Sequence, residues 1–287
     1  MRATHAGRKR LIVNADDLGL SVAVNRGILK AHRQGIVTSA TLLANGPAFD
    51  DAVQRIREAP ELGIGVHLNV LRGAPLTDPE RLPHLTRNGR FHLSWSRMGM
   101  VWRPGMAAEI AWEYRAQIER VLAAGIAITH LDGEKHHQQF PPLFRLLRRL
   151  LPEYGIRAVR CAPESLTFRF GLTKMVKVAI LNTLVRINRA SLEATGIRSP
   201  DHQAGIAMTG KMTVLALETI LSNLPAGVTE LCCHPGCMDA EHLLQTADFG
   251  SFYIDDLREG ELALLTAPDL RRTLALAGID LIHYADL

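Results

Sequence analysis

The sequence predicts an α/β fold, a distorted (β/α) barrel of the TIM type with about seven parallel strands. Short runs rich in β-branched residues alternate with helical patterns along the chain, which is typical of parallel strands joined by crossover helices. The chain has 287 residues, of which 47% are hydrophobic and 22% charged, enough to bury one large core. About seven such strand and helix units favour a barrel over an open sheet.

Each strand is expected where a short apolar or β-branched run ends at a turn or polar residue. The first is centred on Leu11-Ile12-Val13, and the next two read VTSATLL and LGIGVHL. The expected strands are 10–15, 37–43, 62–68, 126–131, 156–161, 228–233 and 279–283. Amphipathic periodicity predicts helices at 21–34, 48–58, 107–123, 141–150, 213–223 and 255–265.

Two stretches break this alternation. Residues 70–105 are rich in Pro, Gly and Arg, and residues 163–212 hold a helical pattern and a polar loop. We find no internal repeat and no low-complexity linker. Both stretches are therefore interpreted as insertions on a single domain of residues 1–287.

Composition excludes several classes of protein. The formal net charge is +4, and the basic clusters lack interleaved aromatic residues, so no nucleic-acid partner is expected. The apolar run after the basic N-terminus is too short for a signal peptide, and no stretch has the roughly 18 charge-free apolar residues of a membrane span. Four cysteines are too few for a disulfide framework in a chain of this length. We expect a cytoplasmic, reduced protein.

Polar residues gather where the predicted strands end. These are Asp16, Asp17, His67, His130, Asp132, His136, His137, Arg160 and His234. Taken singly, an aspartate pair caps a helix, and a histidine is more often a core residue or a turn former. In a parallel barrel, however, all these strand ends lie on one face. Carboxylate and imidazole ligands that leave open positions are what a catalytic divalent metal needs.

Five separated motifs carry a family resemblance: NADDLGLS, GVHLNV, THLDGEKHHQQFP, AVRCAPE and LCCHPG. In this order and spacing, over about residues 9–285, the chain resembles the YdjC-like carbohydrate deacetylases. The resemblance implies a metal-dependent hydrolase on a distorted barrel related to the polysaccharide deacetylases. The segment GEKHHQQFP resembles the hopanoid biosynthesis-associated branch, HpnK.

The resemblance also implies a ligand set. Asp17, His67 and a histidine after the fourth strand would hold one divalent metal. Family members commonly read H-x-D-x-H-x-H-x-H there. The corresponding residues of this chain are His130, Asp132, Glu134, His136 and Gln138. We take His136 as the third ligand, because it keeps a family histidine and His137 is out of register. Zinc is favoured, although cobalt, nickel, manganese and magnesium also suit such a set.

Catalytic roles follow from the same resemblance. Asp16 would take a proton from water, and His234 would protonate the departing amine. Arg160 would orient Asp16 and keep it ionised. His130 and Asp132 are expected to line the substrate site. The cysteines at 232, 233 and 237 lack the two-pair spacing of a structural zinc site, so we expect them to be packing residues.

The implied reaction is removal of acetate from an N-acetylglucosamine unit. The hopanoid branch implies that this sugar is attached to bacteriohopanetetrol, a polycyclic lipid. One alternative is a soluble deacetylase of sugars like diacetylchitobiose, and another is a non-catalytic sugar- or metal-binding module. A binding module would need neither a free base nor an acid, so the presence of Asp16 and His234 speaks against it. The sequence leaves the oligomeric state open, a homodimer included.

A helical pattern at 172–190 bears on the substrate. Its apolar stripe comprises Val176, Ile180, Thr183, Leu184 and Ile187, and the basic residues Lys174, Lys177, Arg186 and Arg189 occupy the broad opposite arc. The stripe could pack on the barrel as core, leaving a solvated basic face. Alternatively, Ile180 and Leu184 could contact a lipid tail or an anionic bilayer, which would make the protein peripheral at the inner membrane.

Overall fold

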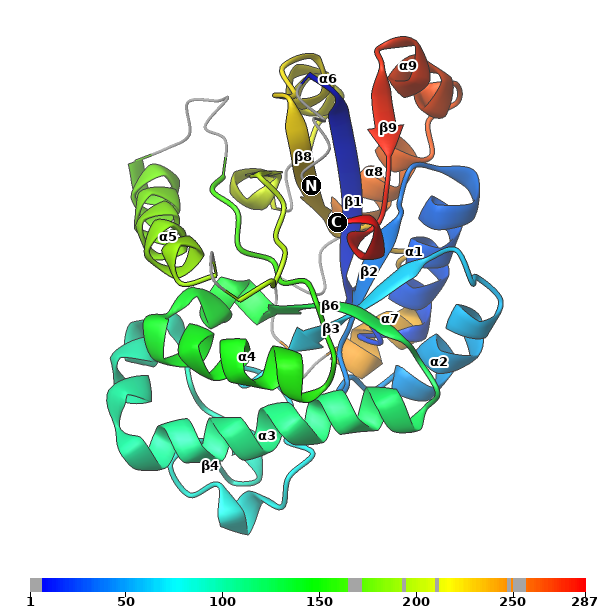
Figure 1. The fold of residues 1–287 in the computed structure, drawn as a ribbon. Helices are drawn as coiled ribbons and strands as arrows, with labels where there is room; N and C mark the ends of the chain where they lie inside the picture. Colours follow the sequence, from blue (N-terminus) through cyan, green and yellow to red (C-terminus); the bar gives the residue numbers. More distant parts are fainter. Residues whose placement is uncertain (1–6, 165–171, 193–194, 210–211, 247–248, 250–256) are drawn as a thin grey trace.

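A parallel sheet forms the centre of the molecule (Figure 1). The computed structural model describes residues 7–164, 172–192, 195–209, 212–246, 249 and 257–287. Six strands follow the order β6, β3, β2, β1, β8, β7, and β9 pairs with the first part of β1. Their bounds are β1 Lys9–Leu18, β2 Ser39–Leu42, β3 Gly63–Leu68, β6 Ile128–Gly133, β7 His202–Ala204, β8 Gly227–Cys233 and β9 Ile279–Leu281. The predicted α/β barrel-like fold with parallel strands is confirmed.

Single bridges continue the sheet beyond its ends. Leu131 of β6 bridges to Val159, and Glu164 bridges to Gln203 of β7. The Arg160 N–H donates to the Leu131 carbonyl oxygen at 3.0 Å, as in a parallel ladder. Residues 158–164 therefore occupy the place between β6 and β7 and curl the sheet toward a barrel.

Two details of this part of the sheet, between β6 and β8, differ from the prediction. The predicted strand 156–161 is wrong as a regular strand, because its residues pair only through isolated bridges to β6 on one side and to Arg198 on the other. The stretch 163–212 is not wholly an insertion, since it contains β7, which pairs with β8. The other six predicted strands are present within a few residues of their expected bounds.

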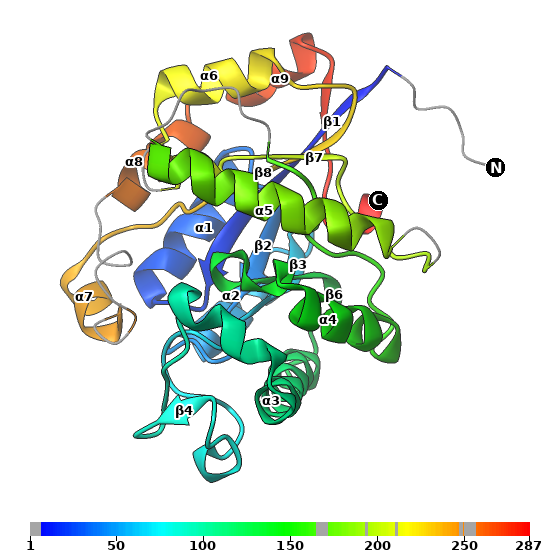
Figure 2. The ribbon, with the colours of Figure 1, turned by 90° about the vertical axis from the view of Figure 1, so that its left-hand side faces the viewer.

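Helices surround the strands. Figure 1 shows α1 and α2 on one side of the sheet and α5 on the other, and Figure 2 shows α5 in front of the strands. Their bounds are α1 Val22–Gln34, α2 Phe49–Arg57, α3 Pro104–Ala123, α4 Pro141–Glu153, α5 Leu172–Ala190, α6 Val214–Ser222, α7 Ala240–Thr246, α8 Leu257–Leu265 and α9 Leu270–Leu276. The sequence did not predict α7 or α9. Residues 255 and 256, where the last predicted helix was expected to begin, lie outside the described residues. Among the described helices, none has the length and hydropathy to cross a bilayer.

The segment at 70–105 is anchored by buried carboxylates of α3. It contains the hairpin β4 (Thr86–Arg87) and β5 (Arg90–Phe91) and the 3₁₀ helices η1 (Pro79–Arg81) and η2 (Trp95–Trp102). Glu113 accepts backbone N–H bonds from Leu76 and Thr77, and Glu109 accepts one from Leu85. These bonds satisfy loop N–H groups that would otherwise be buried without partners. The loop is thereby held at the side of the sheet where β3 and β6 end.

Candidate active site

A β-bulge near the end of β1 turns two consecutive carboxylates toward one site. Ala15 pairs with Ala40 and Leu18 with Leu42, so Asp16 and Asp17 together oppose a single residue of β2. Asp17 has a left-handed φ of 71°. In a regular strand, neighbouring side chains point to opposite faces, whereas a bulge redirects one of them. Both aspartates therefore approach His67 of β3: the Asp17 Oδ1 atom lies 3.8 Å from Nε2, and Asp16 belongs to a second group with that histidine.

Arg160 links Asp16 to two further buried carboxylates. Its guanidinium lies 2.7 Å from Asp16, 2.6 Å from Asp132 and 2.7 Å from Glu230, and its side chain has no solvent exposure. Burial alone would raise the pKa of Asp16, but Arg160 outweighs it and holds the pKa well below the ordinary value. Asn14 donates a further hydrogen bond to Asp16. Asp16 is therefore a fixed, ionised carboxylate beside Arg160.

The two ring nitrogens of His67 face different carboxylates: Nδ1 faces Asp132, whereas Nε2 faces Glu134 and Asp17. Its Nδ1 atom lies 2.7 Å from Asp132 Oδ1, and its Nε2 atom lies 3.3 Å from Glu134 Oε2. Burial opposes protonation, but Asp132 and Glu134 raise the pKa of His67 well above its ordinary value. A carboxylate on the far nitrogen fixes the tautomer of a metal-binding histidine. Asp132 takes this place, and both ends of the buried pair are at most 2% exposed.

The donor atoms around His67 fit one divalent cation. Ligand atoms of Asp17, His67 and Glu134 all lie within 4.8 Å of one another, in a buried group. The predicted third ligand, His136, belongs to none of the three candidate groups found among the described residues. It is buried nearby, and burial together with Arg160 lowers its pKa well below the ordinary value. The structure thus brings Glu134 to Asp17 and His67, and the ligand role of His136 stays a prediction.

The loop after β6 has an uncommon backbone. It forms the 3₁₀ helix η3, Glu134–Gln139, in which Lys135 and His136 both have positive φ. Such conformations cost energy in non-glycine residues and persist where the surroundings fix them. His137 provides that fixation, because its Nδ1 atom donates to the Glu134 carbonyl and its Nε2 atom accepts from the Tyr114 hydroxyl. Burial lowers the pKa of His137 to about 4, so the ring is a neutral structural anchor.

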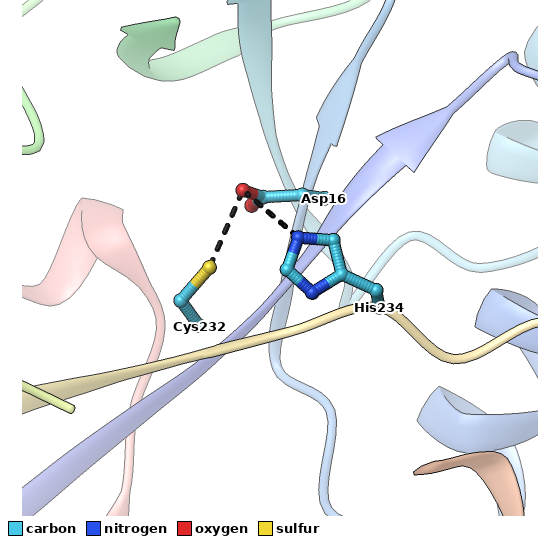
Figure 3. Close-up of side chains that lie close together, drawn as sticks. All are labelled: Asp16, Cys232 and His234. Atoms are coloured by element: carbon cyan, nitrogen blue, oxygen red, sulfur yellow. Dashed lines mark hydrogen bonds and ion pairs between the residues drawn. The ribbon is translucent and has the colours of Figure 1, made fainter. Parts of the chain in front are cut away.

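His234 and Cys232 reach the same carboxylate of Asp16 from β8 (Figure 3). His234 follows Cys233, which pairs with Ala15, and its Nε2 atom lies 4.0 Å from Asp16 Oδ2. The Cys232 thiol donates to the same oxygen at 3.3 Å. Burial, with Asp16 adding to it, raises the pKa of Cys232 well above its ordinary value, which favours a protonated donor over a thiolate ligand. His234 is partly exposed and adjoins Asp16.

The structure places His130 in the protein interior against Tyr284. It is fully buried, and its ring stacks on Tyr284 at a centroid distance of 3.6 Å. A side chain at Gly65 would collide with this ring, so glycine leaves the space that it fills. Tyr284 donates to Glu230, which joins the ring pair to the Arg160 network. A direct role for His130 in substrate binding stays a prediction, as it does for Asp132, which is also fully buried.

Two buried residues of the site were missed by the sequence analysis. Arg258 of α8 donates to Asp17 Oδ2 at 2.5 Å, and Glu230 accepts from Arg160. Glu230 lies within the strand VTELCC, where a charged residue in an apolar run is the available signal. Arg258 stands in no motif, so its proximity to Asp17 depends on how α8 packs.

The apolar stripe of α5 is on the outer side of the helix. Val178, Leu181 and Val185 form the buried face, whereas Ile180 is 50% exposed and Leu184 is partly exposed. The helix itself is confirmed, and of the two alternatives for this stripe, packing on the barrel as core is wrong. This helix has two apolar faces, and the barrel covers the face formed by Val178, Leu181 and Val185.

Comparisons with known proteins agree with this fold. The model of the YdjC-like protein family matches residues 10–276. A carbohydrate deacetylase of Brevibacillus brevis is 33% identical, covering 97% of this chain and 99% of the relative. A chitooligosaccharide deacetylase of Klebsiella pneumoniae is 32% identical, with 96% and 98% covered. A crystallised protein of Enterococcus faecalis, provisionally named a cellobiose-phosphate cleavage protein, superposes with a TM-score of 0.76 at 26% identity, covering 98% of this chain and 99% of that one. The chain therefore belongs to the YdjC-like protein family, among whose relatives are these carbohydrate deacetylases.

Proposed function

We propose that this protein is a metal-dependent N-deacetylase that removes acetate from an N-acetylglucosamine unit. The observation that carries the proposal is the ionised Asp16 held by Arg160 directly beside the Asp17, His67 and Glu134 group. A base next to a cluster of donor atoms is what hydrolysis of an unactivated amide requires. The curated relatives support the reaction class through their printed activity.

Asp17, His67 and Glu134 would hold one divalent cation, zinc being favoured and magnesium, manganese, cobalt or nickel also suiting these donors. Such a cation supplies polarisation of the acetyl carbonyl and a lowered pKa for water. Asp132 keeps the His67 ring in place through its 2.7 Å contact with Nδ1. Arg258 does the same for Asp17 by binding its second oxygen.

The other residues divide the proton transfers between them. Asp16 accepts the proton of the attacking water, and Arg160 keeps the carboxylate ionised and pointed into the site. His234, 4.0 Å from Asp16, donates a proton to the departing amine nitrogen. The backbone N–H of His234 donates to Glu261, which fixes the residue at the end of β8.

The substrate that we favour is N-acetylglucosamine attached to bacteriohopanetetrol. The likeness of GEKHHQQFP to the hopanoid branch and the exposed apolar face of α5 support a lipid-linked sugar. The alternative is a soluble chito-oligosaccharide, which the printed activity of the Klebsiella relative supports. For the lipid-linked substrate, we place the protein in the cytoplasm at the inner membrane surface.

Mass spectrometry of the purified protein with each substrate separates these proposals. Loss of one acetyl group from glycosylated hopanoid, with little from diacetylchitobiose, is the expected result. Turnover of diacetylchitobiose alone would select the soluble sugar. If neither substrate loses acetate with any of the candidate metals, the deacetylase assignment fails and a binding module is left.

The third ligand is tested by metal analysis of matched alanine variants. We expect Glu134→Ala to lose bound metal and activity together, because Glu134 is the residue gathered with Asp17 and His67. His136→Ala is the control, two residues further along the same loop. Full metal occupancy in Glu134→Ala, with metal lost from His136→Ala, would return the ligand role to the histidine.

A further inference from the structure

The outer face of α5 exposes a continuous apolar stripe. Val176, Ile180 and Ile187 are 50%, 50% and 56% exposed, and they recur at i, i+4 and i+11 along the helix. With Thr183 and Leu184 between them, they form what we call the α5 stripe. The opposite side of the helix is already packed, because Val178, Leu181, Val185 and Asn188 are buried. The α5 stripe is therefore not required for the core. Exposed apolar patches of this kind mark interaction sites.

The helix that carries the α5 stripe packs, through its opposite face, against the candidate active site. Helix α5 packs against η3, the loop that carries Glu134, and Asn188 donates to the Gln139 carbonyl at 2.8 Å. Near the other end of the helix, the Lys177 ammonium lies 5.7 Å from the ring centroid of Trp95. Trp95 in turn donates to the Lys135 carbonyl, next to Glu134. A surface that docks on the α5 stripe would therefore contact the outer side of a helix whose inner side packs against the loop of the site.

The charges of α5 indicate what covers the α5 stripe. The sequence of Leu172–Ala190 contains four basic residues and no acidic one. Lys177 and Arg186 were expected on the arc opposite the stripe, but at about 100° per residue they fall nearer its two borders. Both residues are exposed. An apolar stripe bordered by basic side chains matches an anionic bilayer surface, where apolar groups enter the headgroup boundary and basic groups pair with phosphates. A second copy of this helix would instead bring like charges together.

We propose that the α5 stripe docks on the surface of an anionic lipid bilayer. The stripe supplies the apolar contact, and Lys177 and Arg186 supply the attraction to the headgroups. Docking in this way does not depend on which sugar the protein deacetylates. It is therefore measured without substrate.

The test is co-sedimentation with vesicles of equimolar phosphatidylglycerol and phosphatidylcholine, compared with vesicles of phosphatidylcholine alone. The wild-type protein should bind the anionic vesicles and bind the neutral ones at least about tenfold more weakly. The triple variant V176S/I180S/I187S should lose about tenfold or more in binding to the anionic vesicles. These positions are half exposed, and serine has a helix propensity close to that of valine, so the fold should be retained.

Matched controls separate docking from general effects. The double variant L215S/L276S changes two leucines that are 70% and 80% exposed on α6 and α9, and it should bind vesicles like the wild type. Arg186→Gln should weaken binding about fivefold, as removal of one basic residue near a charged surface predicts.

Three results would overturn the proposal: no wild-type binding to anionic vesicles, equal binding by the triple variant, or equal loss in the control. A wild-type dimer that becomes a monomer in the triple variant, without vesicle binding, would assign the α5 stripe to a second copy instead. The catalytic proposal is judged separately, by acetate release from diacetylchitobiose or glycosylated hopanoid dissolved in detergent. Its failure would leave the vesicle result unaffected.

Discussion

Replacing Arg160 with methionine should destabilise the fold more than any exchange of a surface arginine. The guanidinium is fully buried and lies within 2.7 Å of Asp16, Asp132 and Glu230. Methionine fills similar space but leaves three buried carboxylates without this cation. Breaking one side of a buried ion pair costs about 3–5 kcal/mol, against a total stability of about 5–15 kcal/mol for a typical domain. We expect a loss of that size at neutral pH.

The loss should depend on pH with a definite sign. In the wild type, Arg160 holds the pKa of Asp16 well below its ordinary value, so this stabilisation is present above the unfolded pKa and is lost as the pH falls. Without the guanidinium, burial raises the folded pKa of Asp16 above its unfolded value, and ionising this carboxyl group then costs stability as the pH rises. The difference between wild type and variant should therefore be larger at about pH 8 than at about pH 5, both above the unfolded carboxyl values.

Urea unfolding followed by circular dichroism at these two pH values measures the effect. The control is Arg115→Met, which removes an exposed bidentate pair with Glu153 at 3.0 and 2.9 Å and should cost at most about 1 kcal/mol. If Arg160→Met loses no more free energy of unfolding than Arg115→Met at the higher pH, the electrostatic account of this network is refuted.

Three further predictions concern the base, the metal and a second buried carboxyl. Asp16→Asn should keep its bound metal but lose about 10²–10⁴ in rate, the contribution of a general base; near-normal turnover would remove that role. Asp132→Asn should weaken zinc binding about 10–100-fold in calorimetric titration, because it alters the contact that orients His67, and unchanged affinity would contradict this. Burial raises the pKa of Glu164 from 4.5 to about 7, so the folded state keeps a proton that the unfolded state releases. The wild-type free energy of unfolding should therefore fall by about 3 kcal/mol as the pH rises through that window, and Glu164→Gln should show no such fall.

The strands with strong apolar runs could be predicted because a run of consecutive apolar residues itself indicates a buried strand. β7 could not, since its three residues His202–Ala204 offer one apolar side chain and gain their ladder from β8. Residues 156–161 read as a strand, yet their partners on both sides supply only isolated bridges. Strand pairing of this kind is decided by distant segments, which local pattern does not report.

The site shows the same division between local and distant information. Strand ends converge in any parallel barrel, which is why Asp16, Asp17 and His67 could be named from position. The choice between Glu134 and His136 depends on two consecutive left-handed residues in η3, which spacing alone does not reveal. On α5, two apolar faces share the helical period. Periodicity therefore predicts the helix but not which face the barrel covers.

The single bridges on either side of residues 158–164 have a consequence for local opening of the sheet between β6 and β7. Segments with few backbone ladder bonds exchange their amide hydrogens at lower opening free energies than regular strands. This segment carries Arg160, whose side chain reaches Asp16 on β1, Asp132 on β6 and Glu230 on β8. The guanidinium thus links three strands through ion pairs at the place where the sheet has few backbone hydrogen bonds. Local opening of residues 158–164 would move the guanidinium away from Asp16, so the group that keeps this carboxylate ionised also holds the three strands together.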